Sequence, residues 1–182
     1  MKKICRLCLL LLAVSGALLS GCAKTGSNER TEGEAVSSSI TFEALDMEGN
    51  TVSAEIFSET KLTMVNVWAT YCNPCLREMP GLGELAGEYA PEEFRIVGVI
   101  SDVMEDADQK SIDLAASLIE QTNADYPHLL LNESLYYALL TDVTAVPTTF
   151  FIDENGEILD TVVGSMEKFA WEEKVNALLE GK

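Results

Sequence analysis

Apolar residues along the chain fall into short runs of strand length and longer stretches with helical spacing. Residues 62–68, 94–100 and 128–131 are almost continuously apolar, which is typical of strands buried on both faces of a sheet. Helical spacing covers residues 74–90, 108–122, 133–140 and 167–179. Residues 147–152 and 157–163 flank a turn containing Asn-Gly, which predicts a β-hairpin.

A further hairpin is predicted at the start of the folded part, where residues 40–42 and 51–52 flank a turn at 47–50. The order of predicted elements is then β-β-β-α-β-α-β-α-β-β-α. This order favours an α/β fold with a central mixed β-sheet flanked by helices. Residues 23–39 are polar and rich in Ser, Gly and Glu, so we expect a flexible tether before a domain spanning 40–182.

The first residues have the pattern of a bacterial secretion signal. Lys2, Lys3 and Arg6 precede an apolar run at 7–19, which is shorter than the about 20 residues that a membrane-spanning helix needs. The run ends in Leu-Ser-Gly-Cys22, which resembles the lipobox of bacterial lipoproteins. We therefore expect a signal peptide at 1–21, lipidation of Cys22 and an extracytoplasmic, membrane-anchored protein. An ordinary cleaved signal with a chance cysteine and an uncleaved anchor helix are the alternatives.

Charge limits the partners that the chain can bind. It has 12 basic and 30 acidic residues, for a formal net charge of −18, and removal of the signal peptide makes the charge more negative. Nucleic acid and anionic lipid headgroups both attract Lys/Arg clusters, so we expect no nucleic-acid partner. Contact with the membrane is expected through the lipid anchor alone.

The cysteines supply the candidate chemistry. Of five, Cys5 and Cys8 lie in the signal and Cys22 is the lipidation candidate, which leaves Cys72 and Cys75 at the start of a predicted helix. A helix N-terminus stabilises a thiolate, so we expect Cys72 to be the nucleophile and Cys75 to resolve the mixed disulfide. An unreactive structural disulfide is the alternative. A closed zinc site needs four ligands, so no metal is expected.

Two segments, WATYCNPCLREMP and Ala145 to Asp153, together resemble the signatures of the TlpA/ResA family of membrane-tethered thioredoxin-like reductases. The resemblance covers residues 40–180. It implies a thioredoxin fold with an N-terminal β-hairpin extension and a helical insertion, and no cofactor besides a redox-active Cys72–Cys75 disulfide. It also implies a cis Val146–Pro147 bond facing the cysteines, with the Val146 backbone binding substrate.

The same resemblance implies roles for residues around the cysteines. Glu78 is expected near them, tuning their pKa values and relaying protons, with a solvated surface charge as the alternative. Trp68, four residues before Cys72, is expected to pack beside the cysteines and to contribute to substrate binding, with an ordinary core position as the alternative. Asn66 stands where cytoplasmic thioredoxins have a buried acid, which leaves Glu78 as the candidate proton acceptor. The implied partners are oxidised exported proteins, such as apocytochrome c or methionine sulfoxide reductase, and a transmembrane thiol donor of CcdA/DsbD type. We expect a monomer.

Three other functions remain open at this point. A thiol peroxidase of peroxiredoxin type needs a Pro-x-x-x-Thr-x-x-Cys loop, which does not precede Cys72. A copper-delivery protein would use Cys72, Cys75 and His128, although copper chaperones of this fold usually space their cysteines by three residues. A binding module with an unreactive disulfide is the third. Outside the copper alternative, His128 is expected to be a strand residue without a catalytic role. The acidic segment 102–108 is expected to be a solvated loop.

Overall fold

A mixed five-stranded sheet with the order β5-β4-β3-β6-β7 lies at the centre of the domain. The structure is a computed structural model that describes residues 40–181; the predicted signal peptide, Cys22 and tether lie outside the described residues. Strand β3 (Leu62–Trp68) is parallel to β4 (Phe94–Met104), and β4 is parallel to β5 (His128–Leu131). On its other side β3 is antiparallel to β6 (Thr148–Asp153), which pairs with β7 (Ile158–Val163).

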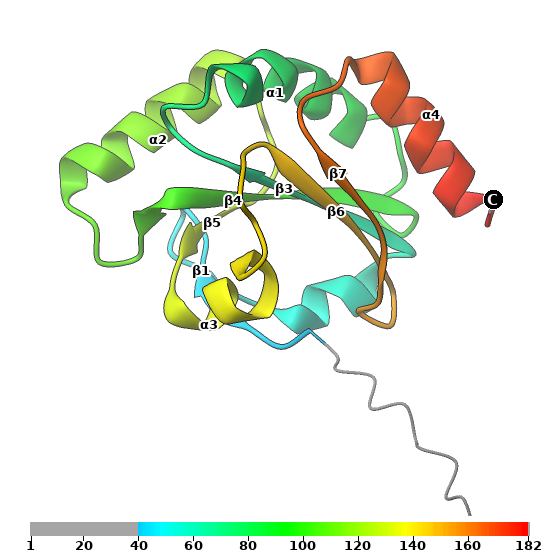
Figure 1. Cartoon of the computed structure of the whole chain (residues 1–182), viewed down its shortest axis with the longest axis horizontal. Coiled ribbons are helices and arrows are strands. Elements are labelled where there is room, and N and C mark those ends of the chain that lie inside the picture. The colour runs from blue at the N-terminus through cyan, green and yellow to red at the C-terminus, as the bar shows by residue number, and fades with distance from the viewer. Residues whose placement is uncertain (1–39, 182) are drawn as a thin grey trace, which may run out of the picture. The chain divides into compact units, whose positions relative to one another are not determined.

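Helices cover one face of this sheet (Figure 1). They are α1 (Asn73–Ala86), α2 (Gln109–Thr122) and α4 (Lys168–Leu179). The other face carries the hairpin of β1 (Glu43–Leu45) and β2 (Thr51–Ser53), the 3-10 helix η1 (Ala54–Glu59), the short α3 (Glu133–Leu135) and the π-helix η2 (Tyr136–Leu140). The predicted thioredoxin-type arrangement is confirmed, with the helical stretch between β4 and β6 supplying the expected insertion.

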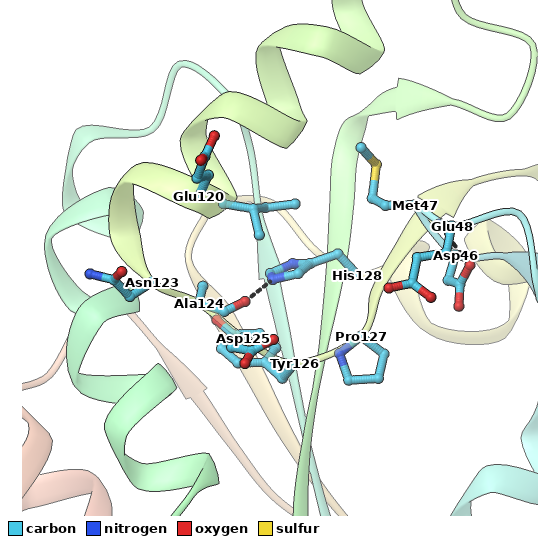
Figure 2. A pocket seen from close by; sticks show the side chains of 11 residues that line it. Asp46, Met47, Glu48, Glu120, Asn123, Ala124, Asp125, Tyr126, Pro127 and His128 are labelled. Carbon is cyan, nitrogen blue, oxygen red and sulfur yellow. Dashed lines mark hydrogen bonds between the residues drawn. The ribbon is translucent and has the colours of Figure 1, made fainter.

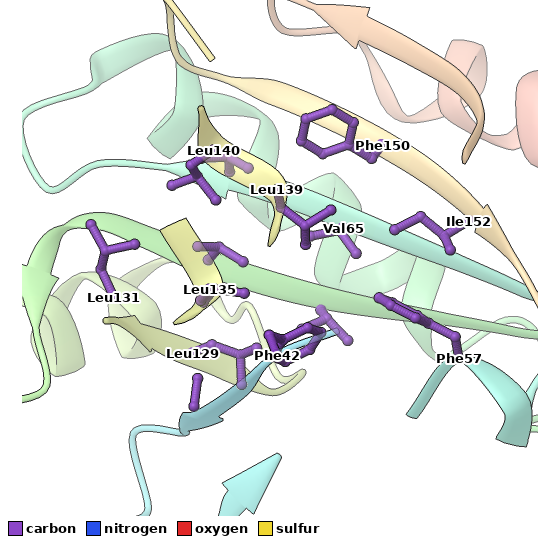
Figure 3. Close-up of a cluster of buried hydrophobic side chains, with 14 residues drawn as sticks. Phe42, Phe57, Val65, Leu129, Leu131, Leu135, Leu139, Leu140, Phe150 and Ile152 are labelled. Carbon is purple, nitrogen blue, oxygen red and sulfur yellow. The ribbon is translucent and has the colours of Figure 1, made fainter. Parts of the chain in front are cut away.

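The central strands are buried on both faces, which explains their continuous apolar sequence. Along β3, Met64 and Trp68 pack under the helices, whereas Val65 and Val67 join a second core on the hairpin side. That second core joins the first hairpin, η1 and η2 to the sheet, and Figure 3 shows Phe42, Phe57 and Val65 within it.

Some predicted boundaries were wrong. Strand β4 continues to Met104, so the acidic segment expected to be a loop begins inside a strand. The first helix ends at Ala86 rather than residue 90, and the first hairpin strand is Glu43–Leu45 rather than 40–42. The helical stretch predicted at 133–140 has the predicted bounds, and its geometry changes from α to π at Tyr136. The 3-10 helix η1 had no counterpart in the sequence prediction. The extension of β4 follows from its pairing with β5, where Met104 lies opposite Leu131, and the local pattern does not encode this pairing.

The register of the sheet brings together the two segments that carry the sequence signatures. Val67, near the end of β3, is paired with Thr148, the first residue of antiparallel β6. The chain leaving β3 toward α1 therefore lies beside the chain entering β6 through Pro147.

The helices within residues 40–181 include none with the length and apolar character that crossing a membrane requires.

Candidate active site

Cys72 and Cys75 form a disulfide at the start of α1, with a Cα–Cα distance of 5.3 Å. Cys72 is the N-cap residue, and its Sγ accepts a hydrogen bond of 3.2 Å from the backbone N–H of Cys75. Pro74 lies in the first turn, where the missing N–H costs no helical hydrogen bond. Cys75 is fully buried and Cys72 is 5% exposed, so substrate reaches the sulfur of Cys72 first.

This position favours the thiolate of Cys72 when the pair is reduced. The free N–H groups of the first turn and the helix dipole both place positive potential at the N-cap. The Cys75 N–H already points at the Cys72 sulfur, so the donor needs no rearrangement to stabilise the anion. The arrangement can therefore supply a nucleophilic thiolate with a second cysteine three residues away to resolve the intermediate.

The second signature lies directly against this disulfide. The Val146–Pro147 peptide bond is cis, as the resemblance predicted, and the carbonyl oxygen of Val146 lies 3.6 Å from the Cys72 Sγ. Two hydrogen bonds hold the segment: Gly164 N donates to the Pro147 carbonyl at 2.8 Å, and Thr148 Oγ1 donates to the Ala145 carbonyl at 2.8 Å. The backbone that would pair with a substrate is thus fixed beside the reactive sulfur.

Glu78 lies three residues after Cys75 on α1 and is buried. Its Oε1 accepts from Asn66 Nδ2 and its Oε2 from the backbone N–H of Met166, both at 3.1 Å. Burial raises the pKa of Glu78 to about 7, although the two donors and the Trp171 indole favour the ionised form. A carboxyl with this pKa exchanges protons near neutral pH, which suits an acid–base role.

Asn66 orients this carboxylate. It is fully buried on β3 and donates through Nδ2 to both Glu78 Oε1 and Thr149 Oγ1. An amide cannot take up a thiol proton, so Asn66 is not a candidate proton acceptor for Cys75.

Trp68 packs in the same buried cluster as both cysteines, and its indole is fixed by His128. Trp68 Nε1 donates to His128 Nδ1 at 3.1 Å, and His128 Nε2 lies 3.1 Å from the Ala124 carbonyl. These partners define a neutral ring with its proton on Nε2. Burial lowers the pKa of His128 to about 4, which is consistent with that neutral form.

The copper site weighed as an alternative function is not assembled. Both nitrogens of His128 are engaged with Trp68 and Ala124, as just described. Within residues 40–181 no group of three or more His, Cys, Asp or Glu side chains could hold a metal ion. The structure therefore joins Cys72 and Cys75 in one site, with Glu78 three residues further along α1, and it places His128 against Trp68 as a structural partner.

Asp102 supports the site in a way that the sequence pattern does not predict. Its carboxylate accepts from Thr70 N at 3.0 Å and from Thr70 Oγ1 at 2.5 Å, which ties the loop before Cys72 to β4. The neighbouring Ser101 Oγ donates to the Trp68 carbonyl at 2.9 Å. The prediction of a loop is wrong at Asp102, which lies in β4, although the side chain is exposed as expected and the chain leaves the strand after Met104.

A pocket of about 620 Å³ lies between the turn after β1 and the segment that joins α2 to β5 (Figure 2). His128 and Tyr126 line it together with acidic side chains: Asp46, Glu48, Glu120 and Asp125. The reactive cysteines are not among its lining residues. The site of thiol chemistry is therefore at the start of α1 and not in this pocket.

Comparisons with known proteins identify the family to which the chain belongs. A family model described as the AhpC/TSA family matches residues 37–161. The chain is 29% identical over 145 residues to the thiol-disulfide oxidoreductase ResA of Halalkalibacterium halodurans, covering 80% of this chain and 77% of ResA. It is 30% identical over 139 residues to the thiol:disulfide interchange protein DsbE of Escherichia coli K12, covering 76% of this chain and 69% of DsbE.

A solved structure, that of DsbF from MTB in mixed oxidised and reduced forms, superposes with a TM-score of 0.63 at 25% identity. The match covers 76% of this chain and 96% of DsbF. A thioredoxin fold with a Cys-x-x-Cys disulfide at the start of a helix defines a thiol–disulfide oxidoreductase. The chain belongs to the AhpC/TSA family of thioredoxin-like proteins and is ResA-like within it.

Proposed function

We propose that this oxidoreductase is an extracytoplasmic, lipid-anchored reductase of disulfides in exported proteins. The observation that carries the proposal is the distance of 3.6 Å between the Cys72 Sγ and the Val146 carbonyl oxygen. An extended peptide that pairs with this backbone presents its own disulfide to Cys72. The anchor rests on the sequence around Cys22, and substrates such as apocytochrome c or methionine sulfoxide reductase rest on the resemblance.

The reaction is a two-electron transfer in two exchange steps. The Cys72 thiolate attacks one substrate sulfur, so that a Cys72–substrate disulfide forms and the other substrate sulfur leaves as a thiolate. Glu78 accepts the proton of the Cys75 thiol, and the Cys75 thiolate then attacks the Cys72 sulfur. The Cys72–Cys75 disulfide forms, the second substrate sulfur leaves, and both substrate thiolates take up protons. A transmembrane thiol donor of CcdA/DsbD type returns two electrons to the pair.

The reduction potential of the Cys72–Cys75 pair, measured by equilibration in defined thiol buffers, tests the direction. A value close to that of thioredoxin, about −270 mV, supports a reductase that depends on an electron supply. A value close to about −120 mV identifies an oxidant that introduces disulfides and overturns the proposed direction.

The roles of the two cysteines are tested by substitution. We expect Cys72→Ser to abolish insulin disulfide reduction, and Cys75→Ser to accumulate mixed disulfides that reducing agent dissolves. Full insulin reduction by either variant contradicts the mechanism. Consumption of hydrogen peroxide is measured in parallel, because peroxide turnover that exceeds insulin reduction would favour the peroxidase alternative.

A further inference from the structure

A small pocket of about 220 Å³ opens beside the reactive disulfide, and the thiol chemistry described above does not use it. Its walls include Tyr71 before the first cysteine, Tyr136 and Leu140 of η2, and residues 143–146 before the cis proline. Ser101 of β4 and Leu131 of β5 complete the lining. We call it the η2 pocket.

The η2 pocket is lined by residues adjacent to the reactive sulfur, although neither cysteine lines it. Tyr71 is the residue directly before Cys72, and Val146 supplies the carbonyl that lies 3.6 Å from the Cys72 Sγ. Tyr71 is 73% exposed and Tyr136 is 43% exposed, so much of the aromatic surface around the opening is in contact with solvent. Large exposed aromatic side chains next to a reaction centre are typical of a recognition surface.

The pocket wall carries no charged side chain in an otherwise acidic protein, and it combines apolar side chains with the hydroxyl groups of Ser101 and Thr144. The chain has a formal net charge of −18, yet none of the residues that line the η2 pocket is ionisable near neutral pH. A charged side chain entering it would lose hydration without gaining an ionic partner, whereas an apolar one would be removed from water. The pocket therefore discriminates by polarity.

We propose that the η2 pocket binds a large apolar side chain, of Leu, Met or Phe size, two residues from the substrate cysteine. The inference rests on the proposed reaction with peptide disulfides. A peptide bonded to Cys72 and paired with the Val146 backbone is extended, and residues two apart in a strand point to the same face at about 7 Å spacing. The side chain on the same face as the substrate cysteine thus reaches the space between Tyr71, Tyr136 and Val143.

The test uses synthetic peptides with one cysteine, coupled as a mixed disulfide to the coloured leaving group thionitrobenzoate. They carry Leu, Ala or Asp two positions before or after the cysteine. We expect the reduced protein to react about tenfold faster with the Leu peptide than with the Ala peptide on one of the two sides, and slowest with Asp. Equal rates for all three residues on both sides overturn the inference.

Matched variants locate the effect. Tyr136→Ser is expected to bring the Leu-to-Ala rate ratio close to one, while Tyr137→Ser leaves it unchanged. Tyr137 is 66% exposed and its ring centroid lies 5.4 Å from that of Tyr136, but it does not line the pocket. Loss of selectivity in both variants would assign the effect to the aromatic pair and contradict the pocket.

A gain of function completes the test. Thr144 is an exposed residue of the pocket wall, and Thr144→Lys is expected to raise the rate with the Asp peptide several-fold relative to the Leu peptide. The reaction with dithiobis-nitrobenzoate, without peptide, measures the reactivity of the cysteines themselves, and the peptide rates of each variant are divided by it. Insulin reduction, measured in parallel, separates the two proposals. Peptide selectivity without insulin reduction contradicts the proposed reductase function. Insulin reduction without peptide selectivity contradicts the proposed binding of an apolar side chain in the η2 pocket.

Discussion

Glu78 and His128 are buried side chains whose pKa values shift in opposite directions for the same reason. Burial disfavours the charged form of each group, so the pKa of the acid rises to about 7 and that of the imidazole falls to about 4. From about pH 4.5 to 7 the folded protein keeps a proton on Glu78 that the unfolded chain releases. From about pH 4 to 6.5 it excludes from His128 a proton that the unfolded chain binds.

These shifts make opposite contributions to the pH dependence of stability. The raised pKa of Glu78 gives a contribution that is complete below about pH 4.5 and is lost as pH rises through 7. The lowered pKa of His128 gives a contribution that is present above about pH 6.5 and is lost as pH falls through 4. Where the two windows overlap, the contributions offset one another.

Replacement of Glu78 by Gln removes the contribution of Glu78 to the pH dependence of stability and leaves that of His128. As pH rises from about 4.5 to 7, the free energy of unfolding of the wild type is expected to fall relative to Glu78→Gln by about 3 kcal/mol. Urea unfolding of the oxidised proteins at several pH values measures the difference. Parallel stability curves for the two proteins would show that Glu78 has an ordinary pKa.

At the scale of elements, α1 carries the active site and packs against its neighbours at unusually short range. A Cβ on Gly83 would lie 2.2 Å from the carbonyl oxygen of Asn123, the residue that caps α2 with left-handed backbone geometry. Directly after the last turn of the same helix, a Cβ on Gly87 would meet only the Glu84 carbonyl, at 3.5 Å. The glycine at 83 therefore sets how closely α1 approaches the end of α2.

Alanine at these two positions is expected to have opposite effects. Gly83→Ala forces the backbones apart and is expected to destabilise the protein by about 2 kcal/mol or more. Gly87→Ala makes an ordinary contact and reduces the freedom of the unfolded chain, so it is expected to be neutral or stabilising by about 0.5 kcal/mol. Denaturant midpoints compare the two variants, and equal losses would mean that helix propensity rather than the close approach decides.

How well the sequence predicted each element depended on how locally that element is determined. Strands β3 and β5 have the predicted bounds, because burial on both faces leaves a continuous apolar run. The end of β4 was missed because its acidic residues resemble a loop, although Asp102 is held there by Thr70. The change to π geometry at Tyr136 has no local signal of this kind.

In the candidate site too, the sequence predicted the features that depend on contiguous residues and missed those that depend on tertiary contacts. The motifs around Cys72 and Pro147 are each contiguous in sequence. Residue type and spacing predicted the reactive pair, and the resemblance to the TlpA/ResA family predicted the cis proline. The Trp68–His128 hydrogen bond joins residues 60 apart and depends on the register that places Gly98 opposite His128. The raised pKa of Glu78 likewise depends on burial beneath neighbours from several elements, and no local pattern specifies it.

At the scale of the whole molecule, the excess of acidic residues opposes the compact state. Thirty acidic side chains against twelve basic ones give a formal net charge of −18, and folding brings these charges closer together. The described ion pairs involve Lys61, Arg95, Lys168 and Lys174, and they offset only part of this repulsion.

Screening is therefore expected to stabilise the protein. Raising sodium chloride from about 10 to 200 mM shortens the Debye length to below about 10 Å, and we expect the melting temperature at pH 8 to rise by a few degrees. Differential scanning calorimetry measures the change, with pH 5 as the internal comparison because partial protonation of the acids weakens the repulsion. A melting temperature that falls with added salt would show that the ion pairs outweigh the net charge.

The close approach of His128 to β4 also constrains how this protein can diverge over evolutionary time. A Cβ at position 98 would lie 2.2 Å from Nδ1 of His128, the same nitrogen that receives the Trp68 hydrogen bond. Substitution at position 98 is therefore expected to be accepted only after the side chain at 128 has become smaller, and loss of the histidine in turn leaves a buried indole N–H without its acceptor. Positions 68, 98 and 128 are therefore expected to co-vary, so that homologues that differ at one of them differ at the others as well.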